Sequence, residues 1–184
     1  MKIEDKILEL KKKESNSWHE PKVGNYHASQ IYDIVRGNLK PKNFFKKQSF
    51  DDQTLLIFEI GNMYHSYIQS LFPKEASEKN LKIECGDFKI VGRVDLVLNE
   101  KPCELKTCSV IPKIYYLSHE YQLQCYLEAL NQDYGYLTYI EKNPRTFLTK
   151  NFKIPRNKEL MDIIIQKVGE FHKILITETN KINK

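Results

Sequence analysis

Apolar residues recur every three or four positions in five parts of the chain, a spacing that is typical of amphipathic helices. The longest part covers residues 51–72, where Ser49 or Asp51 can cap the helix and Pro73 ends it. Its apolar stripe consists of Leu56, Ile60, Met63, Tyr64, Tyr67, Ile68 and Leu71. The same spacing predicts helices over residues 3–13, 28–36, 118–131 and 158–177. Each helix is expected to bury its apolar stripe against a common core.

From residue 81 the apolar pattern changes to period two, which is typical of β-strands. The predicted strands cover residues 81–85, 88–98, 103–108, 134–140 and 147–154. Gly86-Asp87 joins the first two strands in a glycine-first turn that matches the twist of a hairpin, and residues 99–102 turn the chain into the third strand. The resulting order of elements predicts a single α/β domain with a mixed sheet.

The length of 184 residues suits one domain and not comfortably two. Within a single domain we distinguish an N-terminal helix and lead-in (1–25), a core (26–176) and a tail (177–184). A hydrophobic content of 41% with 29% charged residues predicts a water-soluble globular protein, which excludes disordered, collagen and coiled-coil classes. Because no apolar leader and no membrane-length apolar run is present, we expect a soluble intracellular protein, cytoplasmic if it is prokaryotic or viral.

The charge balance is modestly basic, with 29 Lys and Arg against 24 Asp and Glu. This surplus permits a polyanionic partner without demanding one. The segment 39–48 holds Lys40, Lys42, Lys46 and Lys47 around Phe44 and Phe45, and it shows no periodicity. We interpret it as a loop, which could guide a nucleic-acid strand with one Phe as a stacking face. Anchoring of the loop by the two Phe, with solvated Lys, is the equal alternative.

The four cysteines are Cys85, Cys103, Cys108 and Cys125. They contain no C-x-x-C pair, and a chain of this length folds without disulfides. We therefore expect buried free thiols.

The stretch from residue 92 to residue 107 carries the most informative chemistry. If the chain reverses between Asn99 and Glu100, Asp95 and Glu104 lie opposite each other. Alternation then places Lys106 on the face of Glu104. The residues expected to face the other way are Val94, Leu96, Leu98 and Leu105.

Two carboxylates at such positions need a cation between them. With Cβ atoms roughly 5 Å apart, they repel by about 3 kcal/mol at an effective dielectric near 20. Lys106 supplies one positive charge and a divalent cation would supply two, with the carbonyl of Leu105 as a further oxygen ligand. The ordinary alternative is an exposed Glu104–Lys106 ion pair with Asp95 as a polar residue at a strand end.

The arrangement Gly-Arg-Val-Asp95 followed by Glu104-Leu-Lys106 resembles the PD-(D/E)XK nuclease superfamily, in which an Asp and an E-x-K strand form the metal site. More narrowly, it is similar to the RecB-like exonuclease branch, which includes the CRISPR-associated exonucleases. Further matching features, in order, are His65 on an upstream helix, Gln122 and Tyr126 on the helix after the E-x-K strand, and a closing amphipathic helix. The resemblance covers residues 26–176. It implies a restriction-endonuclease-like core with a central mixed sheet flanked by helices.

The resemblance also implies roles for the site residues. Asp95 and Glu104 would hold one or two Mg²⁺ or Mn²⁺ ions, with His65 as an imidazole ligand. Lys106 would orient the attacking water or stabilise developing negative charge. Taken alone, a His on a helix is more often a hydrogen-bonded or exposed residue than a ligand.

The implied DNA contacts are Gln122 and Tyr126, which lie one helical turn apart, with Arg93 and Lys113 as phosphate contacts. Lys46 and Lys47 of the basic-aromatic segment are further candidate DNA contacts. Without the resemblance, Tyr126 would be an ordinary core aromatic residue and Gln122 a solvated one. The chain departs from relatives that carry an iron–sulfur cluster, because no Cys precedes Cys85 and none follows Cys125. We therefore predict no iron–sulfur cluster.

The function that follows is a metal-dependent deoxyribonuclease, acting as an exonuclease on single-stranded DNA with free ends. An endonuclease of restriction or junction-resolving type and a non-catalytic nucleic-acid-binding subunit are the alternatives. The sequence lacks a P-loop pattern, so any helicase, or any other repair, recombination or CRISPR-type partner, would be a separate chain.

Overall fold

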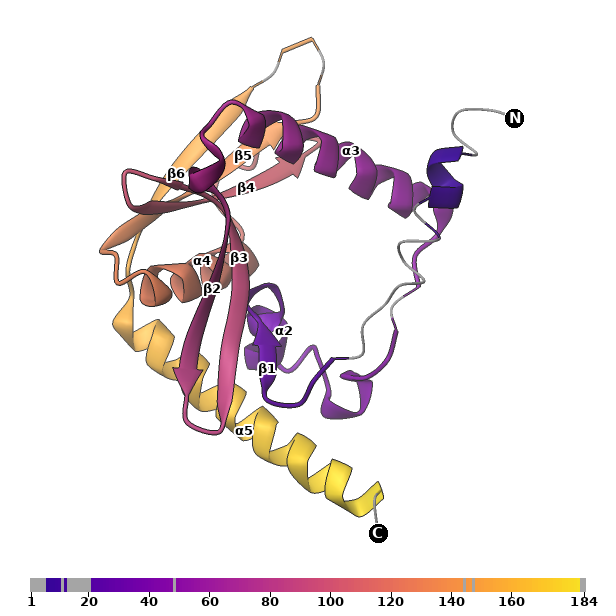
Figure 1. Cartoon of the computed structure of the whole chain (residues 1–184), viewed down its shortest axis with the longest axis vertical. Helices are drawn as coiled ribbons and strands as arrows, with labels where there is room; N and C mark the ends of the chain where they lie inside the picture. The colour runs from indigo at the N-terminus through magenta and orange to yellow at the C-terminus, as the bar shows by residue number, and fades with distance from the viewer. Residues whose placement is uncertain are drawn as a thin grey trace.

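The computed structural model describes residues 6–10, 12, 21–47, 49–143, 145, 146 and 148–182, and it shows one mixed sheet with helices on both faces (Figure 1). The elements in chain order are β1 (Asn25–His27), the 3-10 helix η1 (Ala28–Gln30), α2 (Ile31–Arg36), η2 (Pro41–Asn43), α3 (Asp52–Ser70), η3 (Lys74–Ala76), β2 (Ser77–Cys85), β3 (Phe88–Leu98), β4 (Lys101–Cys108), α4 (Leu117–Ala129), β5 (Tyr134–Glu141), β6 (Thr149–Pro155) and α5 (Lys158–Ile182). This confirms the predicted α/β class and the predicted order of the main elements.

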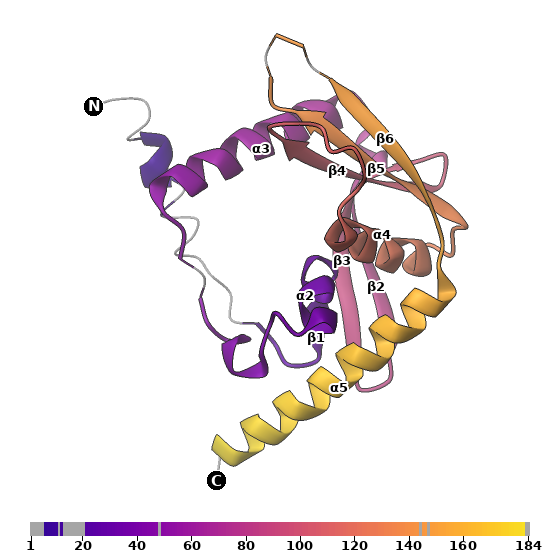
Figure 2. The same cartoon turned by 180° about the vertical axis from the view of Figure 1, so that it is seen from behind.

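The sheet has the strand order β1-β3-β4-β5-β6, and β2 pairs antiparallel with β3 between Phe88 and Leu96. β4 and β5 run parallel because α4 carries the chain across between them, whereas β5 and β6 form an antiparallel pair. Seen from behind, α4 and α5 cover the face of the sheet opposite α3 (Figure 2). β1 runs parallel to β3 and was not expected, because three residues are too short to show a period.

Both hairpin turns have the predicted place. Gly86 has a φ of +70°, which a glycine-first turn requires. Asn99 and Glu100 both have positive φ, at 49° and 67°, which is the backbone of a two-residue type I′ turn. This turn is tighter than the predicted 99–102, so β4 begins at Lys101.

The helix ends follow local chemistry. The side chain of Asp51 accepts a hydrogen bond from the Thr54 amide and caps α3, as predicted. α5 runs to Ile182, beyond the predicted end at residue 177. Residues 6–10 and 12 of the predicted N-terminal helix are helical, and the rest of that prediction lies outside the described residues, as do Gln48 and the predicted strand start at residue 147.

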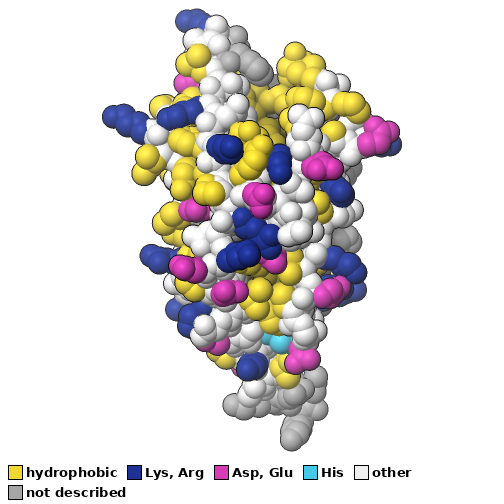
Figure 3. All heavy atoms as spheres, turned by 90° about the vertical axis from the view of Figure 1, so that its left-hand side faces the viewer, with side chains coloured by type: hydrophobic (Ala, Val, Ile, Leu, Met, Phe, Trp, Pro, Cys, Tyr) yellow, Lys and Arg dark blue, Asp and Glu magenta, His cyan; other side chains and the backbone are white. Residues whose placement is uncertain are grey.

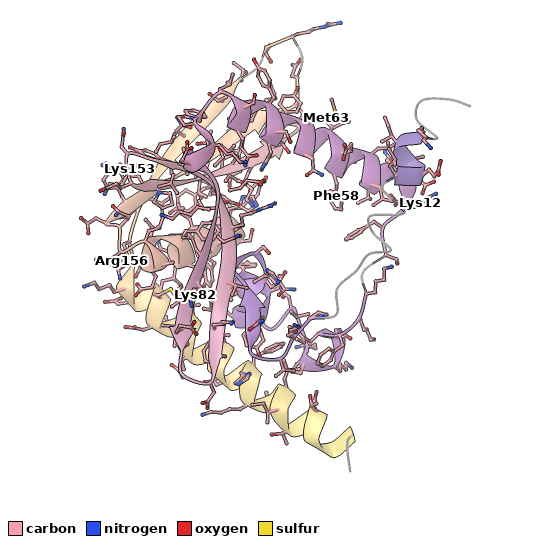
Figure 4. All side chains as sticks on the ribbon, in the orientation of Figure 1. Lys12, Phe58, Met63, Lys82, Lys153 and Arg156 are labelled. Carbon is pink, nitrogen blue, oxygen red and sulfur yellow. The ribbon has the colours of Figure 1, made fainter. Side chains whose placement is uncertain are left out.

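The apolar stripe of α3 is less buried than its periodicity predicts. Tyr64 and Ile68 pack against a small core cluster, whereas Met63, Tyr67 and Leu71 are 64%, 58% and 62% exposed. Met63, Tyr67 and Leu71 recur every four residues and so form a separate stripe beside Tyr64 and Ile68, which the small cluster does not cover. The N-terminal half of α3 also extends past the strands (Figure 1), and Phe58 in that half is 46% exposed; Figure 4 shows Phe58 and Met63 on this helix. A helical period indicates an apolar face but not what covers it.

The small cluster lies between α3 and one face of the sheet, and it contains Leu96 and Leu105 with Leu98 packed against it, as alternation predicts. Val94 instead belongs to the main core beside α4, because β3 passes from one cluster to the other along its length. All four cysteines are free thiols, and Cys103 and Cys125 are buried as expected, while Cys85 and Cys108 are half-buried. In the described part of the chain no helix is both long and apolar enough for a membrane span.

Replacing Gly135 by Ala is expected to destabilise the fold by about 1–3 kcal/mol. An added Cβ would lie 2.7 Å from the carbonyl oxygen of Pro102 and 3.2 Å from Leu123, and backbone cannot yield as a flexible side chain does. The midpoint of thermal unfolding should fall by several degrees, about 2–4 °C per kcal/mol. In the control Gly169→Ala, the added Cβ would lie 3.4 Å from Phe88, so this helical variant should keep or raise the midpoint. Equal midpoints would contradict the packing described.

Candidate active site

The two strands that carry the predicted carboxylates part at Asp95. Their ladder pairs Leu96 with Cys103, which is the predicted register and makes Asp95 and Glu104 the next pair. At that position Asp95 Oδ2 accepts the amide of Leu105 at 2.8 Å. The Asp95 carboxylate thus accepts the amide hydrogen bond that a backbone carbonyl of β3 would otherwise accept. The strands β3 and β4 separate at this point, and the site lies in the gap between them, which we call the fork.

Glu104 is buried at the base of this fork, with 3% of its surface exposed. Its Oε1 accepts a hydrogen bond from Gln122 Nε2 at 2.7 Å and lies 2.9 Å from the ammonium of Lys106. Its Oε2 is also buried, and it has no hydrogen-bond partner within the described residues. The pKa of Glu104 is raised to about 7, because desolvation by burial, together with the charge of Asp95, outweighs the opposing effect of Lys106.

Gln122 connects the acidic and basic groups. Its Oε1 accepts from Lys106 Nζ at 2.9 Å, and its Nε2 also donates to the Tyr126 hydroxyl at 2.9 Å. That hydroxyl donates to the carbonyl of Arg93 at 3.1 Å. Both residues are buried, with 8% of Gln122 and 2% of Tyr126 exposed, and Gln122 contacts Glu104 and Lys106 directly. Their assignment as DNA contacts stays a prediction.

α3 brings His65 to the other side of the fork. His65 Nδ1 lies 3.4 Å from Asp95 Oδ1. The close approach depends on Gly61, one turn earlier, because a Cβ there would lie 3.1 Å from the Thr107 hydroxyl of β4. The Leu105 amide is engaged by Asp95, and the role of its carbonyl as a ligand stays a prediction.

The side chains of the other predicted DNA contacts lie outside this hydrogen-bonded network, although the backbone carbonyl of Arg93 belongs to it. Arg93 is exposed and pairs with Glu78 at 3.3 Å, while exposed Lys113 accepts a hydrogen bond from Lys150 through its carbonyl. In the loop around Lys46 and Lys47, which are both exposed, Phe44 is only 4% exposed and Phe45 is 37% exposed. The anchoring interpretation therefore holds for Phe44.

The positive surplus is also spread beyond the site. On the face seen in Figure 3, several Lys and Arg side chains gather near the middle with Asp and Glu around them. Charge alone therefore does not mark one binding surface.

Two neighbours of the site were missed by the sequence interpretation. Gln69, one turn after His65 on α3, donates to the carbonyl of Asp95 at 3.2 Å. His119 Nδ1 lies 2.7 Å from the Tyr139 hydroxyl, and burial, followed by the charge of Lys106, lowers the pKa of His119 to about 4. Helical spacing could have indicated both residues, because side chains three or four positions apart lie on the same helix face. Gln69 follows His65 by four positions, and His119 precedes Gln122 by three.

The fit of this site to a metal ion rests on its two carboxylates. Among the described residues, no three His, Cys, Asp or Glu side chains are grouped closely enough to hold a metal ion. Mg²⁺ does not need such a group, because it commonly binds one or two carboxylates and keeps several waters. The buried, unpartnered Oε2 of Glu104 fits this mode of binding.

The raised pKa of Glu104 predicts how the metal-free protein responds to pH. The folded protein keeps this proton up to about pH 7, whereas the unfolded chain releases it near the ordinary value of 4.5. The free energy of unfolding in EDTA should therefore fall as pH rises through this window. Urea unfolding at several pH values measures the effect, and Glu104→Gln should remove it. Mg²⁺ should stabilise the protein more at pH 8 than at pH 5, and the opposite order would contradict the assignment.

No protein-family model matches the chain, and no curated protein matches its sequence. Solved structures do match its fold. The crystal structure of SSO0001 is 18% identical with a TM-score of 0.67, covering 95% of this chain and 87% of that one. An alkaline exonuclease (LHK-Exo) from Laribacter hongkongensis is 14% identical with a TM-score of 0.64, covering 88% and 92%.

Two further structures show the same likeness. LHK-Exo in complex with dAMP is 14% identical with a TM-score of 0.62, covering 87% of this chain and 92% of that one. A phage related exonuclease from Haemophilus somnus 129PT is 13% identical with a TM-score of 0.51, covering 90% and 99%. At such identities the comparison shows the fold alone, which is a mixed sheet flanked by helices as in these exonucleases.

Proposed function

We propose that this chain is a metal-dependent deoxyribonuclease that hydrolyses phosphodiester bonds, acting as an exonuclease on single-strand ends. The buried carboxylate of Glu104, beside Asp95 and Lys106 and with one oxygen unpartnered in the described part of the chain, carries the proposal. Such a group is costly to bury unless a cation binds it. The likeness of the fold to alkaline and phage exonucleases supports the same chemistry.

The order of the motifs supports a finer placement in the RecB-like branch of the PD-(D/E)XK superfamily. His65, the Asp95–Glu104 pair and Gln122 come from α3, the β3–β4 hairpin and α4 in that order. His65 contacts Asp95, and Gln122 donates a hydrogen bond to Glu104. A separate helicase chain is the partner that this placement favours.

The proposed cation is Mg²⁺ or Mn²⁺, since both bind hard oxygen ligands and Mn²⁺ also accepts imidazole. Glu104 Oε2 and an oxygen of Asp95 would hold it, with His65 and the carbonyl of Leu105 as further ligands. When bound, such a cation lowers the pKa of a coordinated water and stabilises charge on the scissile phosphate.

Lys106 is oriented to act on the phosphate. An ammonium has three donors, of which one is directed to Glu104 and one to Gln122. The third is left for an oxygen that gains negative charge, and the side chain is 23% exposed. Gln122 fixes both partners at once, because its amide donates to Glu104 and accepts from Lys106.

Digestion of matched linear and circular single-stranded DNA tests the exonuclease proposal. In Mg²⁺ the linear strand should lose nucleotides progressively, while the circle stays intact because it has no end. Cutting of the circle would identify an endonuclease instead. Binding of both substrates without hydrolysis in Mg²⁺ or Mn²⁺ would favour a non-catalytic subunit.

A further inference from the structure

A groove of about 670 Å³ lies next to the fork, lined by His27 and by residues 80–82 and 91–93. The strand register explains its shape. Lys82 of β2 and His27 of β1 lie on either side of Val91, and Asn80 pairs with Arg93 in the next row of the sheet. Since Arg93 is two residues from Asp95, the groove begins about 7 Å from the proposed catalytic pair.

The groove combines the features that bind a nucleotide. Val91 and the backbone at Gly92 form an apolar floor, and Lys82 and Arg93 supply positive charge beside it. His27 and Asn80 add an imidazole face and an amide, which suit base stacking and hydrogen bonding to a base edge. The volume is within the range of sites that hold small ligands.

The two cations of the groove are available to a phosphate. Arg93 pairs with Glu78 at 3.3 Å and Lys82 pairs with Glu84 at 3.1 Å, and the side chains in both pairs are at least 49% exposed. Exposed ion pairs of this kind contribute little free energy to stability. Lys82 and Arg93 can therefore leave their carboxylate partners and bind a phosphate at little cost in free energy.

The floor of the groove is tied to the catalytic network through Tyr126. A Cβ on Gly92 would lie 2.6 Å from the Tyr126 ring, so glycine allows the ring to pack directly under the floor. The Tyr126 hydroxyl donates to the carbonyl of Arg93 and accepts from Gln122, which holds Glu104. A strand lying in the groove would therefore be held in a fixed position relative to Glu104.

We propose that this groove binds one nucleotide of a single DNA strand, next to the phosphate at the Asp95–Glu104 pair. This inference rests on the proposed nuclease function, because it takes single-stranded DNA as the substrate. The phosphate of that nucleotide lies between Lys82 and Arg93, and its base lies on Val91 beside His27.

Binding of a fluorescent single-stranded oligonucleotide, measured by anisotropy in Mg²⁺, tests the groove. All variants carry Glu104→Gln to prevent cleavage. They also carry Glu78→Gln and Glu84→Gln, because removal of Arg93 and Lys82 would otherwise leave these two carboxylates without their cationic partners. Adding Lys82→Ala and Arg93→Ala should raise Kd at least tenfold. The slope of log Kd against log salt should fall by about 0.7, the contribution of one neutralised phosphate on a single strand.

The matched control removes the same charge elsewhere, with Lys101→Ala and Lys153→Ala. Both of these lysines stack on the ring of Tyr134, and Figure 4 shows Lys153 well separated from Lys82. A Kd that is unchanged in the groove variant, or raised equally in the control, would overturn the inference. If the unsubstituted protein fails to hydrolyse DNA while the groove variant alone loses binding, the nuclease proposal falls and the groove stands.

Discussion

Replacing Glu104 by Gln is expected to reduce kcat for DNA hydrolysis by about 10³-fold or more, equivalent to ~4 kcal/mol of transition-state stabilisation. The substitution keeps the size of the side chain but removes the charge that holds the proposed cation. Because Glu104 is buried and its charge is opposed by desolvation, the metal-free variant should be more stable than the parent at pH 8. Initial rates in saturating Mg²⁺ and urea unfolding in EDTA measure the two effects.

Glu128→Gln is the matched control, because Glu128 forms a partly buried ion pair with Arg156 and, among the described residues, has no hydrogen bond or ion pair with the site network. This variant should retain its hydrolysis rate. Full activity of the Glu104 variant, or an equal loss in both variants, would contradict the assignment of Glu104.

Replacing Lys106 by Met is expected to lower kcat by about 10²- to 10³-fold at neutral pH. The ammonium lies 2.9 Å from Glu104 and lowers the pKa of that carboxyl. Without it the pKa of Glu104 rises further, so the residual activity should shift to higher pH. The pH–rate profile separates this electrostatic role from a packing role, since a packing defect would lower the rate without moving the profile.

Lys106→Arg keeps the charge and serves as the companion variant. The pH–rate profile of this variant should lie nearer to that of the parent than the profile of the Met variant does. Its planar guanidinium does not reproduce the geometry of an ammonium, so the rate itself should not fully recover. A Met variant with the parent's rate and profile would show that Lys106 takes no part in the reaction.

The hairpin that carries the site could be predicted because its determinants are local. Asn99 and Glu100 adopt the positive φ values of a tight turn, and the register then follows from the period of two. Counting outward from this turn places Asp95 opposite Glu104 without any knowledge of the rest of the fold.

Which part of the protein packs against each face of helices α3 and α4 could not be predicted in the same way. The periodicity of α3 is correct, but Met63 and Tyr67 lie outside the stripe of Tyr64 and Ile68 that packs against the small cluster, so they are exposed. The burial of Gln122 and Tyr126 likewise depends on α4 packing against β3 and β4, where their partners lie 18 and 33 residues earlier in the chain. Spacing alone places these two side chains on one helix face, and it does not say whether that face meets solvent, DNA or the core.

The release of nucleotides from an end-labelled linear single strand, compared in Mg²⁺ and in EDTA for the unsubstituted protein and Asp95→Asn, tests the central claim most directly. The unsubstituted protein should release nucleotides in Mg²⁺, stop in EDTA and resume when excess Mg²⁺ is added. The Asp95 variant should be slower by about 10³-fold, because it loses one of the two carboxylates that hold the cation. Release at the same rate in EDTA, or by the Asp95 variant, would contradict the account.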